Sequence, residues 1–466
     1  MSSSVKEFVD SGEGIDEEEF LSHLEEVQEE TKALRSSAEG LENRGGKLDG
    51  LPVSVKEQIC TEDFPTTAGS KILENYNPVF DATVVERLKE EGASIIGKTN
   101  MDEFGFGTFC TNSAFEVPRN PHDTDRVVGG SSGGAGALTA ALNYPHIALA
   151  ESTGGSISAP AAFNGVIGIT PTYGRVSRHG LIDYGNSLDK IGVMSKSVYG
   201  AALGLEIIAG KDENDFTTVE KEKGFVERLE KDVKDMKIGV PKQYLEFEGM
   251  EDNVKERFEE AVERLEELGA EVERVNMEKV SRKYAVPAYY IIAVSEASTN
   301  LARYSGMRYG KEGYPEGKDF NEYFSEVRSE HFGEEVKRRI MLGTYARQAG
   351  YREKYYVKAL KARTLIIDEF KEAFERYDIL ASPAMPIIAP TFKEAENLSP
   401  AETYAMDTLT VGPNLAGLPH ASVPMGFSEG MPTGLHLIGD HFEEQKVLNA
   451  AAAYEEGSGH DMAVEV

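Results

Sequence analysis

The chain has 466 residues, of which 40% are hydrophobic, so it is long and apolar enough to bury a large core. Its 80 Asp and Glu against 49 Lys and Arg give a formal net charge of −31, which disfavours extended binding of nucleic-acid phosphates, because such binding rests on basic patches. No apolar run is long enough to span a bilayer, and no charged-then-apolar leader is present. We therefore expect a cytoplasmic protein without membrane contact.

The first 48 residues are predicted to form an acidic N-terminal helix and a linker. Residues 16–36 place Phe20 and Leu24 at helical spacing among acidic residues, which indicates an amphipathic, mostly exposed helix. Residues 36–50 are rich in glycine and are predicted to be the linker. The remainder, 49–466, is predicted to be one large domain.

Strand and helix patterns alternate along most of this domain, which predicts an α/β fold with a mixed sheet. One strand ends at Lys56, and one helix has Asp81 as its expected N-cap and Gly92 as its C-terminal stop. The predicted elements are strands at 51–55, 94–99, 146–150, 166–170, 237–241, 271–275, 378–383, 420–426 and 434–439; helices at 81–93, 135–142, within 195–235, at 253–268 and at 443–456; a turn-rich stretch at 100–134; and a helical insertion at about 283–377.

Cys60 and Cys110 are the only cysteines. Two cysteines make neither a disulfide framework nor a metal-ligand set. We expect both to be buried thiols, and we expect no metal site in this chain.

The segment GASIIGKT, residues 92–99, matches the letters of a phosphate-binding loop. Such a loop is a glycine-rich turn between a strand and a helix. Here the first glycine ends a helix and the middle residues have the pattern of a strand, so the context argues against nucleotide binding.

The segment GGSSG, residues 129–133, matches the nucleophile elbow of α/β-hydrolases with Ser131 at its tip. Asp407 and His420 follow in the chain order of a Ser–Asp–His triad. The elbow also needs a buried strand immediately before the turn, and HDTDRVV offers only two apolar residues there. The elbow stays a rival hypothesis.

A third interpretation combines three segments. Lys56 ends a buried strand, GGSSGG supplies Ser131 and Ser132 on a tight turn, and STGGS supplies Ser156 on another turn. Backbone N–H groups in such turns point outward and suit a developing oxyanion. A single Gly-Gly-Ser turn is usually structural, whereas the combination is far more specific.

This combination resembles the amidase signature family over about residues 49–457, with Gly50, Pro52 and Lys56 fitting its G-x-P-x-x-x-K strand. The resemblance implies the amidase-signature fold, a mixed sheet with helices on both faces. It also implies that Ser156 attacks an amide carbon, Ser131 relays the proton and Lys56 acts as base, with Ser132 left open as the alternative bridge. The implied oxyanion hole is formed by the backbone of Thr153, Gly154 and Gly155.

A lysine that acts as a base must be neutral. The free pKa of lysine is about 10.4, so neutrality near pH 7 needs a depression of roughly 3 units, or about 4 kcal/mol. Burial among apolar residues such as Val53 and Val55 can lower a lysine pKa in this way.

Two positions depart from the family pattern. Ser152 stands where the family usually has Asp, and Ser158 stands where it usually has Arg. Removing one member of a buried ion pair is costly, whereas replacing both members can be nearly neutral. We interpret the two changes as a coordinated substitution.

Within the family, the segments GKTNMDEFGFGT, PTYGRVSRHGLIDY, RRIMLGTYA and NLAGLPHASVP are most similar to glutaminase subunits of tRNA-dependent amidotransferases. The resemblance implies that glutamine is hydrolysed and that its ammonia converts Glu-tRNA(Gln) to Gln-tRNA(Gln). The implied glutamine-binding residues are Arg339, Asp407 and, as a weaker candidate, Tyr290.

The implied partners are a B subunit, which would hold ATP and Mg²⁺ and make most of the contacts with tRNA, and a small C subunit. No cofactor is expected in this chain. Two alternatives stay open: a stand-alone amidase that acts on small amides, and a non-catalytic scaffold subunit.

Overall fold

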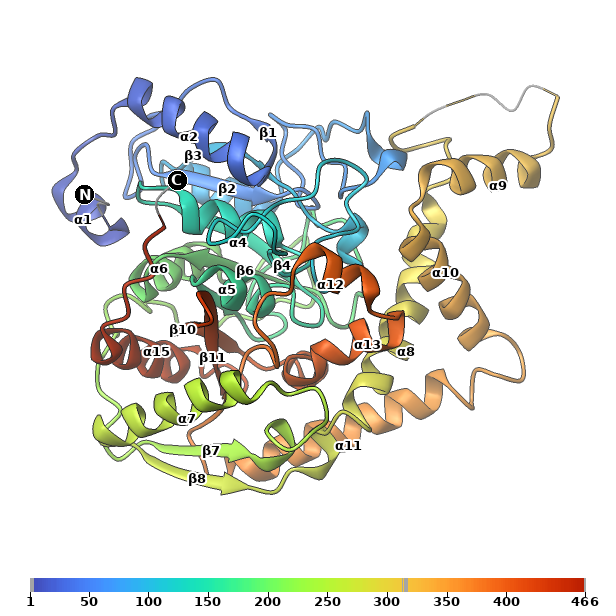
Figure 1. Cartoon of the computed structure of the whole chain (residues 1–466). Helices are drawn as coiled ribbons and strands as arrows, with labels where there is room; N and C mark the ends of the chain where they lie inside the picture. Colours follow the sequence, from blue (N-terminus) through green and yellow to red (C-terminus); the bar gives the residue numbers. More distant parts are fainter. Residues whose placement is uncertain (1–3, 312, 314–316, 465–466) are drawn as a thin grey trace.

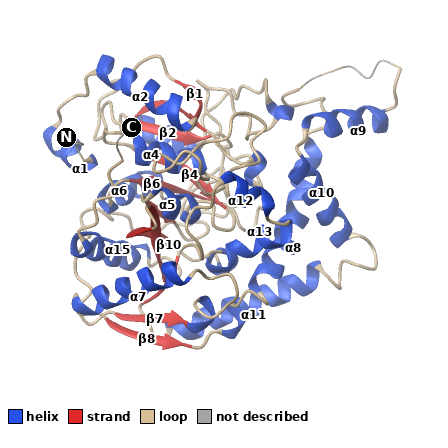
Figure 2. Cartoon of the chain, viewed as in Figure 1, coloured by secondary structure: helices blue, strands red, loops and turns tan. Residues whose placement is uncertain are grey.

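The computed structural model describes residues 4–311, 313 and 317–464. Within these residues, eleven strands form one sheet in the order β1-β3-β2-β4-β6-β5-β10-β11-β9-β7-β8 (Figures 1 and 2). Neighbours β2, β3 and β4 run parallel, whereas β10 and β11 run antiparallel, so the sheet is mixed as predicted.

The strands are β1 (Leu34–Ser37), β2 (Pro52–Lys56), β3 (Ser94–Thr99), β4 (Ile147–Ser152), β5 (Ile167–Thr170), β6 (Lys190–Ser195), β7 (Lys237–Pro241), β8 (Glu271–Val275), β9 (Ile379–Pro383), β10 (His420–Ser428) and β11 (Met431–Gly439). The helices are α1 (Val5–Ser11), α2 (Glu17–Thr31), α3 (Thr83–Glu90), α4 (Gly133–Ala141), α5 (Ser158–Asn164), α6 (Val198–Ile208), α7 (Asp252–Glu267), α8 (Ala285–Asn300), α9 (Phe320–His331), α10 (Glu334–Arg347), α11 (Tyr356–Phe374), α12 (Phe392–Asn397), α13 (Pro400–Ala405), α14 (Val411–Ala416) and α15 (Glu444–Ser458).

Helices cover both faces of the sheet. Side chains alternate between the two faces along a strand. In β4, Ile147 and Leu149 join a core cluster with Leu203 of α6, whereas Ala148 and Ala150 join a separate cluster with residues of α4 and α5. The small residues of α4 and α5 let these helices lie close to the strands that carry the candidate site.

The helical region expected at 283–377 contains α8, α9, α10 and α11, which gather on one side of the sheet (Figure 1). α8 contacts both α10 and α11. Side chains of α8, α10 and α11 form a second core together with residues from the loops after β3 and before β6. This shared core fixes the helices against the loops that surround the candidate site.

Several predicted boundaries differ from the structure. Leu34–Ser37, expected at the end of a helix and in a linker, forms edge strand β1, because its backbone pairs with β3. The central strand β6 is absent from the predicted elements, and of the interval 195–235 only α6 is helical, with turns and loops after it.

Asp81 does not cap α3. The N-cap of this helix is Ala82, and the Asp81 carboxylate instead accepts a hydrogen bond from Glu62 N and pairs with Lys89 at 2.6 Å. Gly92, with φ +95°, follows the helix end as predicted. Cys60 and Cys110 are both buried free thiols, also as predicted. No helix of the described residues is long and apolar enough to cross a membrane.

Gly343 of α10 should be essential to the contact between α10 and α8. A Cβ atom at this position would lie 1.8 Å from the carbonyl oxygen of Val294. Gly343→Ala should lower the free energy of unfolding by about 1–3 kcal/mol, because overpacking forces the helices apart. Thr344→Ala, at an exposed neighbour on α10, should change it by less than about 0.5 kcal/mol. Chemical unfolding of both variants measures the difference, and equal stabilities would contradict it.

Candidate active site

The three predicted segments meet where β2 and β4 end. Lys56 is the last residue of β2, and β4 lies beside β2 in parallel. Ser156 stands in the turn between β4 and α5, and Ser131 stands two residues before α4. Because parallel neighbours end at the same edge of a sheet, Lys56 and the Ser156 turn share one edge.

Lys56 is fully buried, and its ammonium has three acceptors. Its Nζ donates to Ser131 Oγ at 2.8 Å, to the Glu151 carbonyl at 3.1 Å and to Glu151 Oε2 at 2.9 Å. Three acceptors match the three N–H donors of a charged ammonium. Lys56 is buried beside Val53 and Val55 as predicted, and a buried carboxylate, which the sequence analysis did not foresee, also contacts it.

The geometry distinguishes the two serines of the first turn. Ser131 contacts Lys56, whereas the Ser132 hydroxyl donates to the Glu151 carbonyl at 2.9 Å. The backbone N–H of Ser132 donates to the Ser156 carbonyl at 3.3 Å and so ties the two turns together. The peptide bond between Gly130 and Ser131 is cis.

The Ser156 turn presents free donors and a free hydroxyl. Within the part of the chain that the structure describes, neither the backbone N–H groups of residues 153–156 nor Ser156 Oγ has a hydrogen-bond partner. A Cβ on Gly154 would lie 2.3 Å from the Tyr289 hydroxyl, so only glycine lets the ring approach this closely. Unpaired N–H groups in one turn can stabilise an oxyanion.

Asp102 organises the loop that carries Ser131. Its carboxylate accepts the backbone N–H groups of Cys110 at 3.0 Å and Asn112 at 2.9 Å, and its own N–H donates to the Ser131 carbonyl at 3.2 Å. A Cβ on Gly130 would lie 2.2 Å from Asp102 Oδ2, which requires glycine there. Burial raises the pKa of Asp102 to about 6.

A small cavity brings the candidate nucleophile and the candidate glutamine-binding residues together. Ser156, Tyr290, Arg339 and Asp407 all line it, although they come from four separate parts of the chain. Tyr289 lines the same cavity and is not among the predicted site residues, since adjacent tyrosines in an apolar helix carry no sequence signal of a site.

Arg339 is buried rather than on the helix surface. Its guanidinium donates to Glu335 Oε1 at 2.8 Å and to the Tyr184 hydroxyl at 2.6 Å, and aromatic rings surround it. Asp407 accepts the Tyr290 hydroxyl, and burial raises the pKa of Asp407 to about 6. Above that pH the cavity offers a fixed cation and an anion.

The two competing motifs take other roles. Residues 94–99 of the phosphate-loop match form β3, and Lys98 is buried with its Nζ donating to Thr61 and Thr66. His420 contacts Ser158 at 3.2 Å and His436 at 2.9 Å. Burial lowers the pKa of His420 well below its ordinary value, which makes it a poor base.

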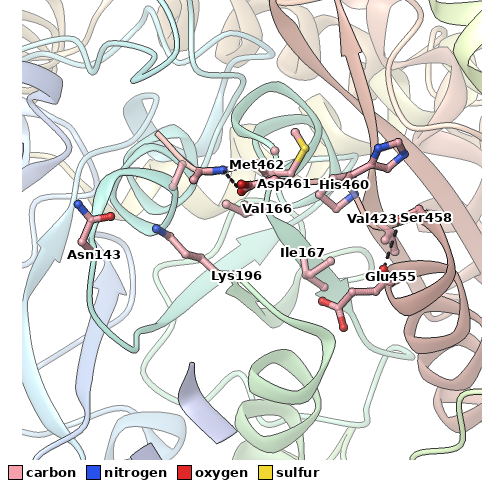
Figure 3. Close-up of a pocket in the computed structure, with 14 residues that line it drawn as sticks. Asn143, Val166, Ile167, Lys196, Val423, Glu455, Ser458, His460, Asp461 and Met462 are labelled. Carbon is pink, nitrogen blue, oxygen red and sulfur yellow. Dashed lines mark hydrogen bonds between the residues drawn. The ribbon is translucent and has the colours of Figure 1, made fainter. Parts of the chain in front are cut away.

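A second cavity, of about 280 Å³, lies between β5, β10 and the C-terminal segment, and Figure 3 shows Lys196, His460 and Met462 on its wall. None of its lining residues is a predicted site residue. No cluster of three or more His, Cys, Asp or Glu side chains able to hold a metal ion occurs among the described residues.

The sequence profile of the amidase family matches residues 13–448. The chain belongs to the amidase family. The site geometry lies wholly within the matched residues.

Two amidase-family relatives match most of the chain. The A subunit of glutamyl-tRNA(Gln) amidotransferase from Archaeoglobus fulgidus is 53% identical over 404 residues, which cover 87% of this chain and 85% of that protein. The protein of the same name from Halothermothrix orenii is 46% identical over 461 residues, covering 97% and 94%. The crystal structure of the corresponding A subunit from Thermotoga maritima matches with a TM-score of 0.84 and 40% identity, covering 100% of this chain and 98% of that one.

The positions that depart from the amidase signature have separate surroundings. The buried Ser152 hydroxyl has no hydrogen-bond partner in the described parts of the chain, whereas Ser158 contacts His420. Glu151 is not among the predicted site residues, although a carboxylate in the apolar strand HIALAES is the signal that could have indicated it.

His420 gives a direct test between the elbow and the lysine site. His420→Asn should destabilise the fold by about 1–3 kcal/mol, because Ser158 and His436 lose a buried partner. Labelling of Ser156 by a serine-directed acylating probe should stay within about threefold of wild type, because His420 lies outside the reacting unit. Mass spectrometry of the labelled peptides provides the measurement. Labelling on Ser131 that disappears in His420→Asn would favour the elbow.

Proposed function

We propose that this chain is the glutaminase subunit of a glutamyl-tRNA(Gln) amidotransferase. The observation that carries the proposal is the shared cavity of Ser156, Arg339 and Asp407. A cation and an anion beside a free serine hydroxyl suit an amide that bears a carboxylate and an ammonium at its other end, as glutamine does. The names of the relatives support the same assignment.

Ser156 Oγ attacks the side-chain amide carbon of glutamine. Its proton passes to Ser131, and the Ser131 proton passes to the neutral amine of Lys56, a relay that the 2.8 Å contact supports. The backbone N–H groups of Thr153, Gly154 and Gly155 stabilise the oxyanion. Lys56 then gives the proton to the leaving ammonia, and water releases glutamate from the acyl-enzyme.

Substrate selection rests on Arg339 and Asp407. Arg339 binds the glutamine carboxylate, since a guanidinium can hold a carboxylate with two hydrogen bonds. Asp407 binds the ammonium, and Tyr290 orients Asp407 through its hydroxyl. Glu335 holds Arg339 in place from one turn earlier in α10.

The ammonia passes to a partner that amidates Glu-tRNA(Gln). We assign ATP, Mg²⁺ and most tRNA contacts to this B subunit, because the acidic chain has no usable phosphate loop and a charge of −31. A C subunit completes the complex, and a role in translation implies a cytoplasmic location. Glutamine hydrolysis should rise when B and C subunits, ATP and Glu-tRNA(Gln) are added; full activity of the isolated chain on small amides would favour a stand-alone amidase.

The serines of the first turn form a matched pair for testing the relay. Ser131→Ala, Lys56→Ala and Ser156→Ala should each lower kcat for glutamine hydrolysis by about a thousandfold or more, and the Lys56–Ser156 double variant should be little worse, because members of one unit are not additive. Ser132→Ala should keep kcat within about tenfold of wild type. Steady-state kinetics of the assembled complex provides the measurement. Equal losses in Ser131→Ala and Ser132→Ala would contradict the assigned bridge, and unchanged hydrolysis in all three of Lys56→Ala, Ser131→Ala and Ser156→Ala would leave only a scaffold role.

Arg339→Lys tests substrate selection. It should lower kcat/KM for glutamine by one to two orders of magnitude, about 1.5–3 kcal/mol for a charge-assisted contact. Hydrolysis of a simple amide without charged groups should change little. Arg338→Lys, on the same helix but half-exposed, is the control and should leave both substrates unaffected. Equal losses on both substrates would mean that Arg339 supports the fold instead.

A further inference from the structure

Four ionisable side chains are buried together behind Ser156. Lys56, Glu151 and Asp189 are fully buried, and Lys190 is 3% exposed. Lys56 ends β2, and Glu151 lies in β4. Asp189 immediately precedes β6, whose first residue, Lys190, pairs in register with Ser152. Such a cluster is stable only if its protons are arranged so that little net charge remains.

Thr153 links the two carboxyl groups. Its Oγ1 lies 2.7 Å from Glu151 Oε1 and 2.8 Å from Asp189 Oδ1. A threonine hydroxyl carries one proton and can donate to only one of them. The second contact is a hydrogen bond only if that carboxyl is itself protonated and donates to Thr153.

Of the two carboxyl groups, Asp189 is the one that is protonated. Burial, and after it the nearby Glu151, raise the pKa of Asp189 well above its ordinary value, and this outweighs the backbone N–H groups of Tyr184 and Gly185, which donate to its carboxyl at 2.9–3.0 Å and favour the ionised form. Glu151 Oε2 already accepts a hydrogen bond from Lys56 Nζ at 2.9 Å, so the other oxygen, Oε1, is the one that faces Thr153. Thr153 then accepts from Asp189 and donates to Glu151.

Lys190 balances the charge. Its Nζ has no hydrogen-bond partner in the described residues, and burial lowers the pKa of Lys190 to about 7. With Asp189 protonated and Lys190 in its neutral form, which a pKa of about 7 makes available near pH 7, the remaining charges are the Lys56 ammonium and the Glu151 carboxylate. The cluster is then neutral, and a proton can move between these two groups without changing its net charge.

We propose that Glu151 is a positioning residue that takes the proton of Lys56, so that Lys56 enters the reaction as a neutral amine. The proton moves from Nζ to Oε2: one N–H bond breaks, one O–H bond forms, and Lys56 keeps the electron pair. Protonated Asp189 acts through Thr153 and holds Glu151 in place. The inference rests on the proposed function, in which Lys56 is the base for Ser156.

Polar and charged groups from several neighbouring elements face the Lys56–Glu151 pair. Thr153 contacts Glu151 directly, and Ser131 contacts Lys56. Through space, the Glu151 charge acts on Asp189 and Lys190, and the Lys56 charge acts on Asp102 and Cys110 in the loop before Ser131. Further out, Asp183 acts on Asp189, and Arg363 acts on Lys190. Glu151 does not line the substrate cavity. Replacing Glu151 should therefore affect proton transfer from Lys56 and not glutamine binding.

Glu151→Gln keeps the size of the side chain but removes the acceptor. The Lys56 ammonium must then lose its proton to solvent before each turnover. On the assembled complex, the pH below which kcat/KM for glutamine falls (the acid limb) should rise by at least about one unit. At pH 7, kcat should be lowered about tenfold or more, and KM should be unchanged. At high pH the variant should approach wild type. If Glu151 only paired with the ammonium, its removal would ease deprotonation, and the limb would move down.

Two further variants keep the result interpretable. Glu444→Gln replaces another fully buried glutamate, which does not contact Lys56. The Glu444 carboxylate accepts a hydrogen bond from Thr172 N at 3.0 Å. This variant should leave the pH profile unchanged. Glu151→Asp retains an ionisable group and should restore the acid limb of wild type at a reduced rate. The inference is overturned if the acid limb of kcat/KM stays in place or moves to lower pH in Glu151→Gln. It is also overturned if the limb moves to higher pH equally in Glu151→Asp. Inactive wild type, or active Ser156→Ala, overturns the proposed function instead.

Discussion

The burial of the Lys56 amine is the constraint on which the site depends. A lysine at the end of an interior strand has no access to water, so every hydrogen bond to Nζ must come from the protein. The parallel pairing of β2 with β4 supplies two of the three acceptors from Glu151, and the turn before α4 supplies the third from Ser131. These contacts therefore fix the position of the amine at the edge of the sheet.

The helical region makes this sheet edge a selective cavity. α10 carries Arg339, and the short turn after α13 carries Asp407, and both reach the Ser156 turn through the second core. Aromatic rings surround the Arg339 guanidinium and fix its orientation. The chemistry and the choice of substrate thus come from different parts of one continuous fold.

The departures from the amidase signature acquire a physical interpretation beside Glu151. Ser152 and Ser158, where the sequence analysis expects the family pattern to have Asp and Arg, carry no charge, and the Glu151 carboxylate, one residue before Ser152, contacts Lys56 directly. Moving by one residue along a strand turns a side chain to the other face. The Glu151 carboxylate therefore contacts Lys56. Ser158 instead contacts His420, which in turn contacts His436.

The sequence by itself determined the α/β class, most of the strands and the segments that carry Lys56, Ser131 and Ser156, because periodicity, turn residues and local motifs are encoded by near neighbours. It did not determine β1 and β6, since a short edge strand and a strand containing Lys190 lack a clear pattern until their partners are known. Nor could it join Arg339 to Asp407, decide between Ser131 and Ser132, or reveal Glu151 beside Lys56. Those relations depend on contacts between residues far apart in the chain, and only the pairing of strands and the packing of helices creates them.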